Sequence, residues 1–208
     1  STGGVCNLLI LWMEQVSVSI TGWEDIRGWF GDTDANLYDM SVKKFPDGSR
    51  FVEVGCWHGR SSLAMVDCII RNNKQICFYC VDHFNGSEEN KQEPSVIANT
   101  VFEEYCKNIE PHKEYIKTVR LSSEEACLGF EDNSLDFVYI DASHEYEHVS
   151  KDLDIWHKKI KPGGILSGHD WGWPIFNHAV QRAVINFAKQ NNYVIHNEFD
   201  NSWYLYKK

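Results

Sequence analysis

Short apolar runs alternate along the chain with longer segments in which apolar residues recur at helical spacing. The runs have the length of strands, and Leu135–Ile140 is apolar at nearly every position, which is typical of a strand covered on both faces. Strands are predicted in this way at Arg50–Val54, Ile76–Val81, Tyr115–Leu121, Leu135–Ile140 and Ile165–Ser167. Helices are predicted at Ser61–Arg71, Val96–Asn108, Ser122–Phe130, His148–Ile160 and Phe176–Gln190, with Pro162-Gly-Gly ending the fourth.

Alternating strands and helices form right-handed βαβ units and hence a parallel sheet. After the last helix, Tyr193–Phe199 and Ser202–Tyr206 flank Asp200-Asn201 and predict a closing hairpin. The sequence therefore predicts an α/β fold with a Rossmann-like, doubly wound, mostly parallel seven-stranded sheet and a C-terminal antiparallel hairpin. We expect one compact unit in which residues 46–208 bind the ligand at the carboxyl ends of the strands. Residues 1–45 are expected to form an N-terminal helical cover over one end of the sheet.

Composition narrows the classes of partner. Of the 208 residues, 43% are hydrophobic and 24% are charged, as is usual for a globular protein, and the net charge is −10. This charge argues against nucleic acid or an anionic membrane as the main partner. The apolar stretch Leu8–Met13 is too short to span a bilayer and lacks the flanks of a signal peptide.

Seven scattered cysteines, an odd number, favour a reducing, cytoplasmic location. Cys77 and Cys80 form a C-x-x-C that could bind zinc or carry redox chemistry. They lie in an apolar run typical of a buried strand, however, and no second Cys/His pair completes a set of four ligands. The chain begins Ser-Thr-Gly-Gly without a methionine, so we expect it to be a domain of a longer polypeptide, and a homodimer is left open.

The first predicted strand runs into a turn framed by two glycines. Gly55 and Gly59 would let a ligand approach backbone N–H groups at the start of the next helix. Their spacing is not the G-x-G-x-x-G that fits a pyrophosphate. Glu53 lies beneath the turn, and a carboxylate there suits a cationic ligand such as a sulfonium-bearing amino acid, although Glu53 could also be an ordinary surface acid.

The ends of the next two strands carry further polar groups. Asp82 follows the second strand, where an acid can accept both hydroxyls of a ribose. Ser122 and Ser123 follow the third strand, where a purine would lie, although Ser122 could serve only as a helix cap.

These residues resemble a known family. Glu-x-Gly-x-x-x-Gly-x-Ser at 53–61, Val81-Asp82 and Leu135–Asp141 are similar to class I S-adenosylmethionine-dependent methyltransferases. The segments from Ile140 to Val149 and from Pro162 to Trp171 are closer to the subgroup called methyltransferase family 24, whose relatives include metal-dependent O-methyltransferases of sugars and catechols. The resemblance implies that S-adenosylmethionine is the cofactor. The cofactor-binding residues would be Glu53, Gly55, Trp57, Gly59, Ser61, Asp82, His83, Ser122, Ser123 and Asp141.

A second group of residues concerns the acceptor. Asp141 ends the fourth predicted strand and Asp170 the fifth, and together with His169 they would suit a divalent cation, Mg²⁺ or Mn²⁺. The resembled enzymes have an acidic pair at the fifth strand, so His169 is a departure. His144 is the candidate catalytic base, acting with Asp141, unless it merely caps the following helix.

Trp171 and Trp173 follow the proposed metal site directly and are the candidate acceptor-binding residues. The resemblance thus implies a metal-dependent O-methyltransferase that acts on a hydroxyl of a small-molecule or glycan acceptor, such as a deoxyhexose like rhamnose. The alternatives are a metal-independent small-molecule methyltransferase, a nicotinamide-dependent oxidoreductase and a non-catalytic cofactor-binding subunit.

Overall fold

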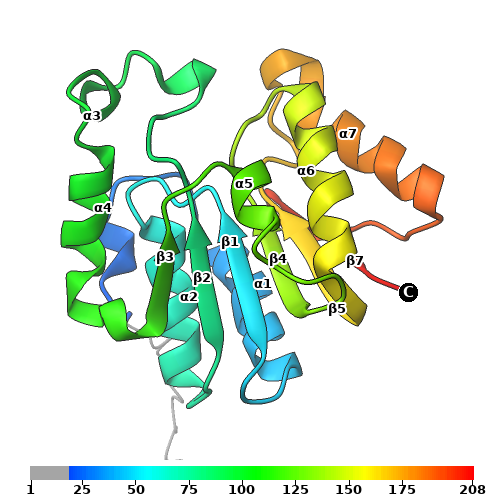
Figure 1. The fold of residues 1–208 in the computed structure, drawn as a ribbon, viewed down its shortest axis with the longest axis horizontal. Helices are drawn as coiled ribbons and strands as arrows, with labels where there is room; N and C mark the ends of the chain where they lie inside the picture. Colours follow the sequence, from blue (N-terminus) through cyan, green and yellow to red (C-terminus); the bar gives the residue numbers. More distant parts are fainter. Residues whose placement is uncertain (1–18) are drawn as a thin grey trace, which may run out of the picture.

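Seven strands form one sheet in the computed structural model, which describes residues 19–208 (Figure 1). Leu8–Met13 and Cys6 lie outside the described residues. The order across the sheet is β3-β2-β1-β4-β5-β7-β6. The strands are β1 (Arg50–Val54), β2 (Cys77–Val81), β3 (Ile116–Val119), β4 (Leu135–Ile140), β5 (Ile160–Gly168), β6 (His196–Phe199) and β7 (Ser202–Tyr206). The predicted α/β fold and closing hairpin are confirmed.

The centre of the sheet is parallel and one edge is antiparallel. β1 pairs in parallel with β2 on one side and with β4 on the other, while β7 pairs antiparallel with both β5 and β6. The parallel strands therefore end at the same edge of the sheet, at the top of Figure 1, and the loops that follow them meet there.

Helices cover both faces of the sheet. On one face, α1 (Asp32–Lys44), α2 (Arg60–Arg71) and α4 (Val101–Ile109) share an apolar core with β1 and β2. On the other face, α5 (Ser123–Cys127), α6 (Tyr146–Lys159) and α7 (Ile175–Asn191) enclose a second core. Burial on both faces accounts for the continuous apolar runs of the central strands.

Residues 19–45, the described part of the segment predicted to cover one end of the sheet, include helix α1. The side chain of Tyr38 on α1 is fully buried and packs at 4.9 Å between ring centroids on Tyr139 of β4, so α1 lies against a face of the sheet. Before α1, a short 3₁₀ helix (Trp23–Asp25) packs against α2. Of residues 19–45, those that line the cavity described below are 27–30.

Two predicted helix boundaries were wrong for local reasons. The helix expected at Val96–Asn108 is divided into α3 (Pro94–Ile97) and α4, because Asn99 adopts a left-handed φ of 56°. The residues Pro162-Gly-Gly do not stop a helix but lie inside β5, which begins at Ile160. A 3₁₀ turn (Glu88–Asn90) lies in the expected polar loop, and 3₁₀ helix Glu110–Tyr115 precedes β3. Among the helices of residues 19–208, none has the length and apolarity needed to cross a membrane.

Candidate active site

A cavity of about 1140 Å³ lies at the carboxyl ends of the parallel strands and is lined by the loops that follow β1 to β5. Its volume is slightly above the range of about 300–1,000 Å³ that is typical of small-molecule sites. The predicted site residues that line it are Gly55, Trp57, Ser61, Asp82, His83, Ser122, Ser123, Asp141, His144, His169, Asp170 and Trp173. The predicted residues that do not line it are Glu53, Gly59 and Trp171.

The two glycines of the first turn are required by the packing of the chain itself. At Gly55 the φ is 92°, and an added Cβ would lie 2.0 Å from the carbonyl oxygen of Asp141. At Gly59 the φ is 88°, and a Cβ would lie 3.2 Å from the ring of Tyr105 and 3.1 Å from Ile109. The first glycine thus brings the turn after β1 against the turn after β4.

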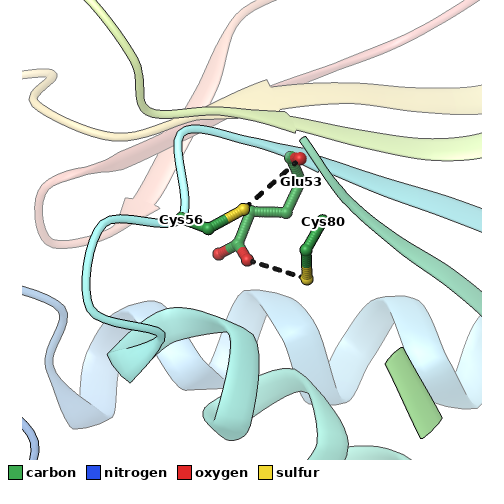
Figure 2. A group of neighbouring side chains, drawn as sticks. All are labelled: Glu53, Cys56 and Cys80. Atoms are coloured by element: carbon green, nitrogen blue, oxygen red, sulfur yellow. Dashed lines mark hydrogen bonds between the residues drawn. The ribbon is translucent and has the colours of Figure 1, made fainter. Parts of the chain in front are cut away.

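Glu53 lies under this turn with no exposed surface (Figure 2). Its carboxylate accepts a hydrogen bond from the hydroxyl of Tyr38 at 3.2 Å and a short one from Ser62. Burial raises the pKa of Glu53 to about 7, although these hydroxyls oppose the shift. Glu53 therefore supports the turn from within the core, and its carboxylate does not reach the cavity that it was predicted to line.

Glu53, Cys56 and Cys80 form a group whose ligand-type atoms lie within 4.8 Å of one another (Figure 2). The Cys80 thiol donates to Glu53 Oε2 at 3.6 Å, and the Cys56 thiol contacts the carbonyl oxygens of Glu53 and Val81. Burial raises the pKa of both thiols, so this core favours protonated cysteines over metal-binding thiolates. Cys77 lies on the opposite face of β2 from Cys80, so the C-x-x-C does not converge on one site.

Asp82 ties the turn after β1 to the end of β2. Its Oδ2 accepts hydrogen bonds from the backbone N–H groups of Cys56 at 2.8 Å and Trp57 at 2.9 Å, and its Oδ1 accepts one from Phe84 at 2.6 Å. A carboxylate offers about four lone-pair positions, so Oδ1 keeps room for one further donor. The neighbouring His83 accepts a hydrogen bond from the backbone of Asn85.

The two serines after β3 have separate roles. Ser122 caps α5 and accepts a hydrogen bond from the N–H of Glu125, so the predicted cap is confirmed. Ser123 joins α5 to α6, because its hydroxyl accepts from the Trp156 indole at 2.8 Å and donates to Asp152.

Asp141, His144 and Asp170 bring one oxygen or nitrogen atom each to within 4.8 Å of the others. His144 Nε2 lies 2.7 Å from Asp170 Oδ2 and 3.7 Å from Asp141 Oδ1. This nitrogen is buried and, despite these short distances, has no partner in hydrogen-bond geometry among the described residues. Two carboxylates and an imidazole nitrogen that face a common point without hydrogen bonding fit a divalent cation such as Mg²⁺ or Mn²⁺.

His169, predicted as a metal ligand, lies beside this group. Its Nδ1 is 3.3 Å from Asp170 Oδ1 and 4.0 Å from Asp141 Oδ1. Its Nε2 faces Asp34 of α1 at 3.4 Å, and Asp34 is held by the hydroxyl of Ser202 at 2.7 Å. The orientation of His169 is therefore fixed by its contact with Asp34, which Ser202 holds in turn.

The carboxylates at this end of the cavity determine the protonation states of His144 and His169. Burial alone would lower the pKa of His144, but the surrounding carboxylates outweigh burial and raise the pKa to about 12. The same balance raises the pKa of His169 to about 11, and the two imidazoles hold the pKa of Asp170 well below its ordinary range in spite of burial. Both histidines are thus protonated near neutral pH in the chain alone, and a cation would compete with these protons.

Sequence reasoning missed two acidic residues of this site. Glu89, in the loop after β2, makes a short contact with His144 Nδ1, and Asp34 faces His169. Neither residue directly follows a predicted strand, so the sequence pattern did not indicate that they belong to this site. Trp171, predicted to bind the acceptor, packs instead against the core of α6 and α7, whereas Trp173 lies 5.0 Å from the His144 ring.

Comparison with known proteins places most of the cavity-lining strands and loops in a methyltransferase domain. The model of a methyltransferase-domain family matches residues 52–171. A protein of Acanthamoeba polyphaga mimivirus, described as uncharacterized, is 31% identical over 129 residues, which are 60% of this chain and 52% of that protein. The chain thus spans about half the length of this curated relative.

Solved methyltransferase structures share the fold. The O-methyltransferase NovP matches with a TM-score of 0.66 at 15% identity, over 86% of this chain and 81% of that chain. The O-methyltransferase TomG from Streptomyces achromogenes, in complex with SAM, matches with a TM-score of 0.58 at 10% identity, over 86% and 82%.

Proposed function

Because the chain belongs to the methyltransferase-domain family, we propose that it transfers a methyl group from S-adenosylmethionine to an oxygen atom of a small-molecule or glycan acceptor, with a divalent cation at the acceptor end. The single observation that carries this proposal is that two groups of polar residues line the same cavity. Asp82 and the turn after β1 lie at one part of it, and Asp141, His144 and Asp170 lie at another.

The cofactor would lie along the edge of the sheet. Gly55, Trp57 and Ser61 would surround its methionine part, Asp82 Oδ1 would accept a hydrogen bond from the ribose, and the base would lie toward Ser122 and Ser123. The indole Nε1 of Trp57 supports this placement, because it is buried without a hydrogen-bond partner in the described part of the chain. A ligand carboxylate would satisfy this donor.

The acceptor would lie beside the second group. Asp141, His144 and Asp170 would hold the cation, which would lower the pKa of a bound hydroxyl and stabilise negative charge on its oxygen. His144 as a ligand and His144 as the catalytic base require the same Nε2 lone pair, and the position of that nitrogen between Asp141 and Asp170 favours the ligand role. The chain's own contribution is to hold the acceptor oxygen in line with the sulfonium methyl and to exclude water.

Support for transfer to oxygen comes from the fold relatives NovP and TomG, which are described as O-methyltransferases. Support for a sugar comes from two aromatic side chains that line the cavity while remaining exposed, Trp29 at 66% and Trp173 at 37%. Such rings can pack against the apolar face of a pyranose such as rhamnose.

Calorimetric titration tests the proposal. We expect the chain to bind S-adenosylhomocysteine and not NAD, and to bind Mn²⁺ or Mg²⁺ in a way that Asp170→Asn abolishes. Release of S-adenosylhomocysteine during incubation with S-adenosylmethionine and a panel of methyl hexosides should then stop on chelation. Binding of NAD alone would refute the methyltransferase assignment, and unchanged turnover in EDTA would leave a metal-independent enzyme.

A further inference from the structure

Asp152, on helix α6, is a buried carboxylate that lines the cavity and is separate from the proposed metal ligands. It is 5% exposed, and its Oδ1 accepts a hydrogen bond from the Ser123 hydroxyl. The hydroxyl of Ser123 is itself fixed by the Trp156 indole. Since α5 and α6 lie side by side on one face of the sheet (Figure 1), this chain of hydrogen bonds sets the orientation of the carboxylate at the cavity wall.

The carboxylate is incompletely satisfied by the protein. Burial raises the pKa of Asp152 to about 6, and the nearby Glu124 acts in the same direction, while Ser123, His148 and Lys151 oppose the shift. Within residues 19–208 the Ser123 hydroxyl bonds to Oδ1, whereas Oδ2 accepts no hydrogen bond and is not fully buried, so it is open to the cavity. A buried carboxylate with an open oxygen gains most from a ligand that donates a hydrogen bond.

The position of Asp152 identifies the part of the ligand that it would meet. The methyl group must lie next to Asp141 and Asp170, at the ends of β4 and β5. The rest of the cofactor must then extend past Asp82, at the end of β2, toward the far side of the cavity formed by Ser123 and Asp152. In this placement the purine would lie at the end of the cavity that Ser123 and Asp152 line, within reach of the carboxylate of Asp152.

We propose that Asp152 accepts a hydrogen bond from the exocyclic 6-amino group of the cofactor's adenine and so selects adenine over hypoxanthine. The inference rests on the proposed function. The 6-amino group of adenine can donate a hydrogen bond to the carboxylate. The 6-keto oxygen of hypoxanthine cannot, because both it and the carboxylate oxygen are acceptors. Asp152 is therefore a specificity-determining residue, and its bond to Ser123 positions it.

Calorimetric titration with S-adenosylhomocysteine and S-inosylhomocysteine, in which a keto oxygen replaces the 6-amino group, tests this proposal. We expect the native chain to bind the adenosine form about 10- to 100-fold more tightly. Asp152→Asn keeps an acceptor for Ser123 and adds a donor, so it should lose about tenfold affinity for the adenosine form and most of the discrimination. Asp154→Asn, an exposed position on the same helix, should match the native chain.

Equal affinity of the native chain for the two ligands would overturn the proposal, and so would unchanged discrimination in Asp152→Asn. Asp152 would then only join α5 to α6. If the variant does not fold, the affinities of the native chain for S-adenosylhomocysteine and S-inosylhomocysteine still test the proposal. Binding of neither ligand would refute the proposed function itself, and this inference with it.

Discussion

Ionisation of Glu53 is expected to set the pH dependence of stability. Its carboxylate has no exposed surface, and burial raises its pKa from the ordinary 4.5 to about 7. Between these two values the folded chain retains a proton that the unfolded chain has lost. The stabilisation from this proton is therefore complete below pH 4.5 and is lost as the pH rises through 7.

The magnitude follows from the two pKa values. Each pKa unit corresponds to about 1.4 kcal/mol, so the native chain should lose about 3 kcal/mol of unfolding free energy from this group across the interval. Glu53→Gln cannot ionise and retains an oxygen that can accept from Tyr38 or Ser62. The unfolding free energy of the variant relative to the native chain should therefore rise by about 2 to 3 kcal/mol between pH 5 and pH 8.

Urea unfolding followed by tryptophan fluorescence at pH 5 and pH 8 measures this difference. The other titrating groups are common to both proteins and cancel in the comparison. Glu131→Gln is the matched control, since Glu131 is exposed and the same change there should leave the difference near zero. A Glu53→Gln variant whose stability differs from native by the same amount at both pH values would refute the reasoning.

Three further predictions concern the turn and the proposed cation site. His144→Ala should weaken Mn²⁺ binding at least about tenfold by calorimetry and leave S-adenosylhomocysteine affinity unchanged, whereas unchanged Mn²⁺ affinity would return His144 to the role of base. Glu89→Gln removes the carboxylate that faces His144 Nδ1 and should weaken Mn²⁺ binding by about 10- to 100-fold, an effect whose absence would mean that Glu89 does not orient the imidazole. Gly55→Ala should lower the unfolding free energy by at least about 2 kcal/mol more than Gly48→Ala. Both glycines have a positive φ, but only a Cβ at Gly55 would meet the Asp141 carbonyl. Equal losses of unfolding free energy in urea would contradict this reason.

The sheet was largely predictable because a strand that is buried on both faces is a nearly continuous apolar run in the sequence. Arg50–Val54 and Leu135–Ile140 have the predicted bounds, since each is flanked by polar or glycine residues. The start of β5 was not predictable from local sequence. The N–H of Gly163 donates to the carbonyl of Lys207, and the N–H of Lys207 donates to that of Gly164, so the strand is extended by residues more than forty positions away along the chain.

The site was predictable only where function follows a strand end. Asp141 and Asp170 were predicted because they follow strands β4 and β5, and the structure places them beside His144. Glu89 contacts His144 from 55 positions away, and Asp34 contacts His169 from 135 positions away. These side chains act through the tertiary fold, so neither spacing nor periodicity could have marked them.

The contact between Gly55 and the carbonyl of Asp141 makes the two turns a single rigid element. The backbone N–H of Asp141 also donates to the carbonyl of Val54 at 2.8 Å, which locks the same pair from the other side. The distance between a methyl donor held by one turn and an acceptor oxygen held by the other is thus fixed by main-chain packing. In the proposed function, substitutions at the exposed cavity residues Trp29 and Trp173 would change which acceptor binds without moving these two turns.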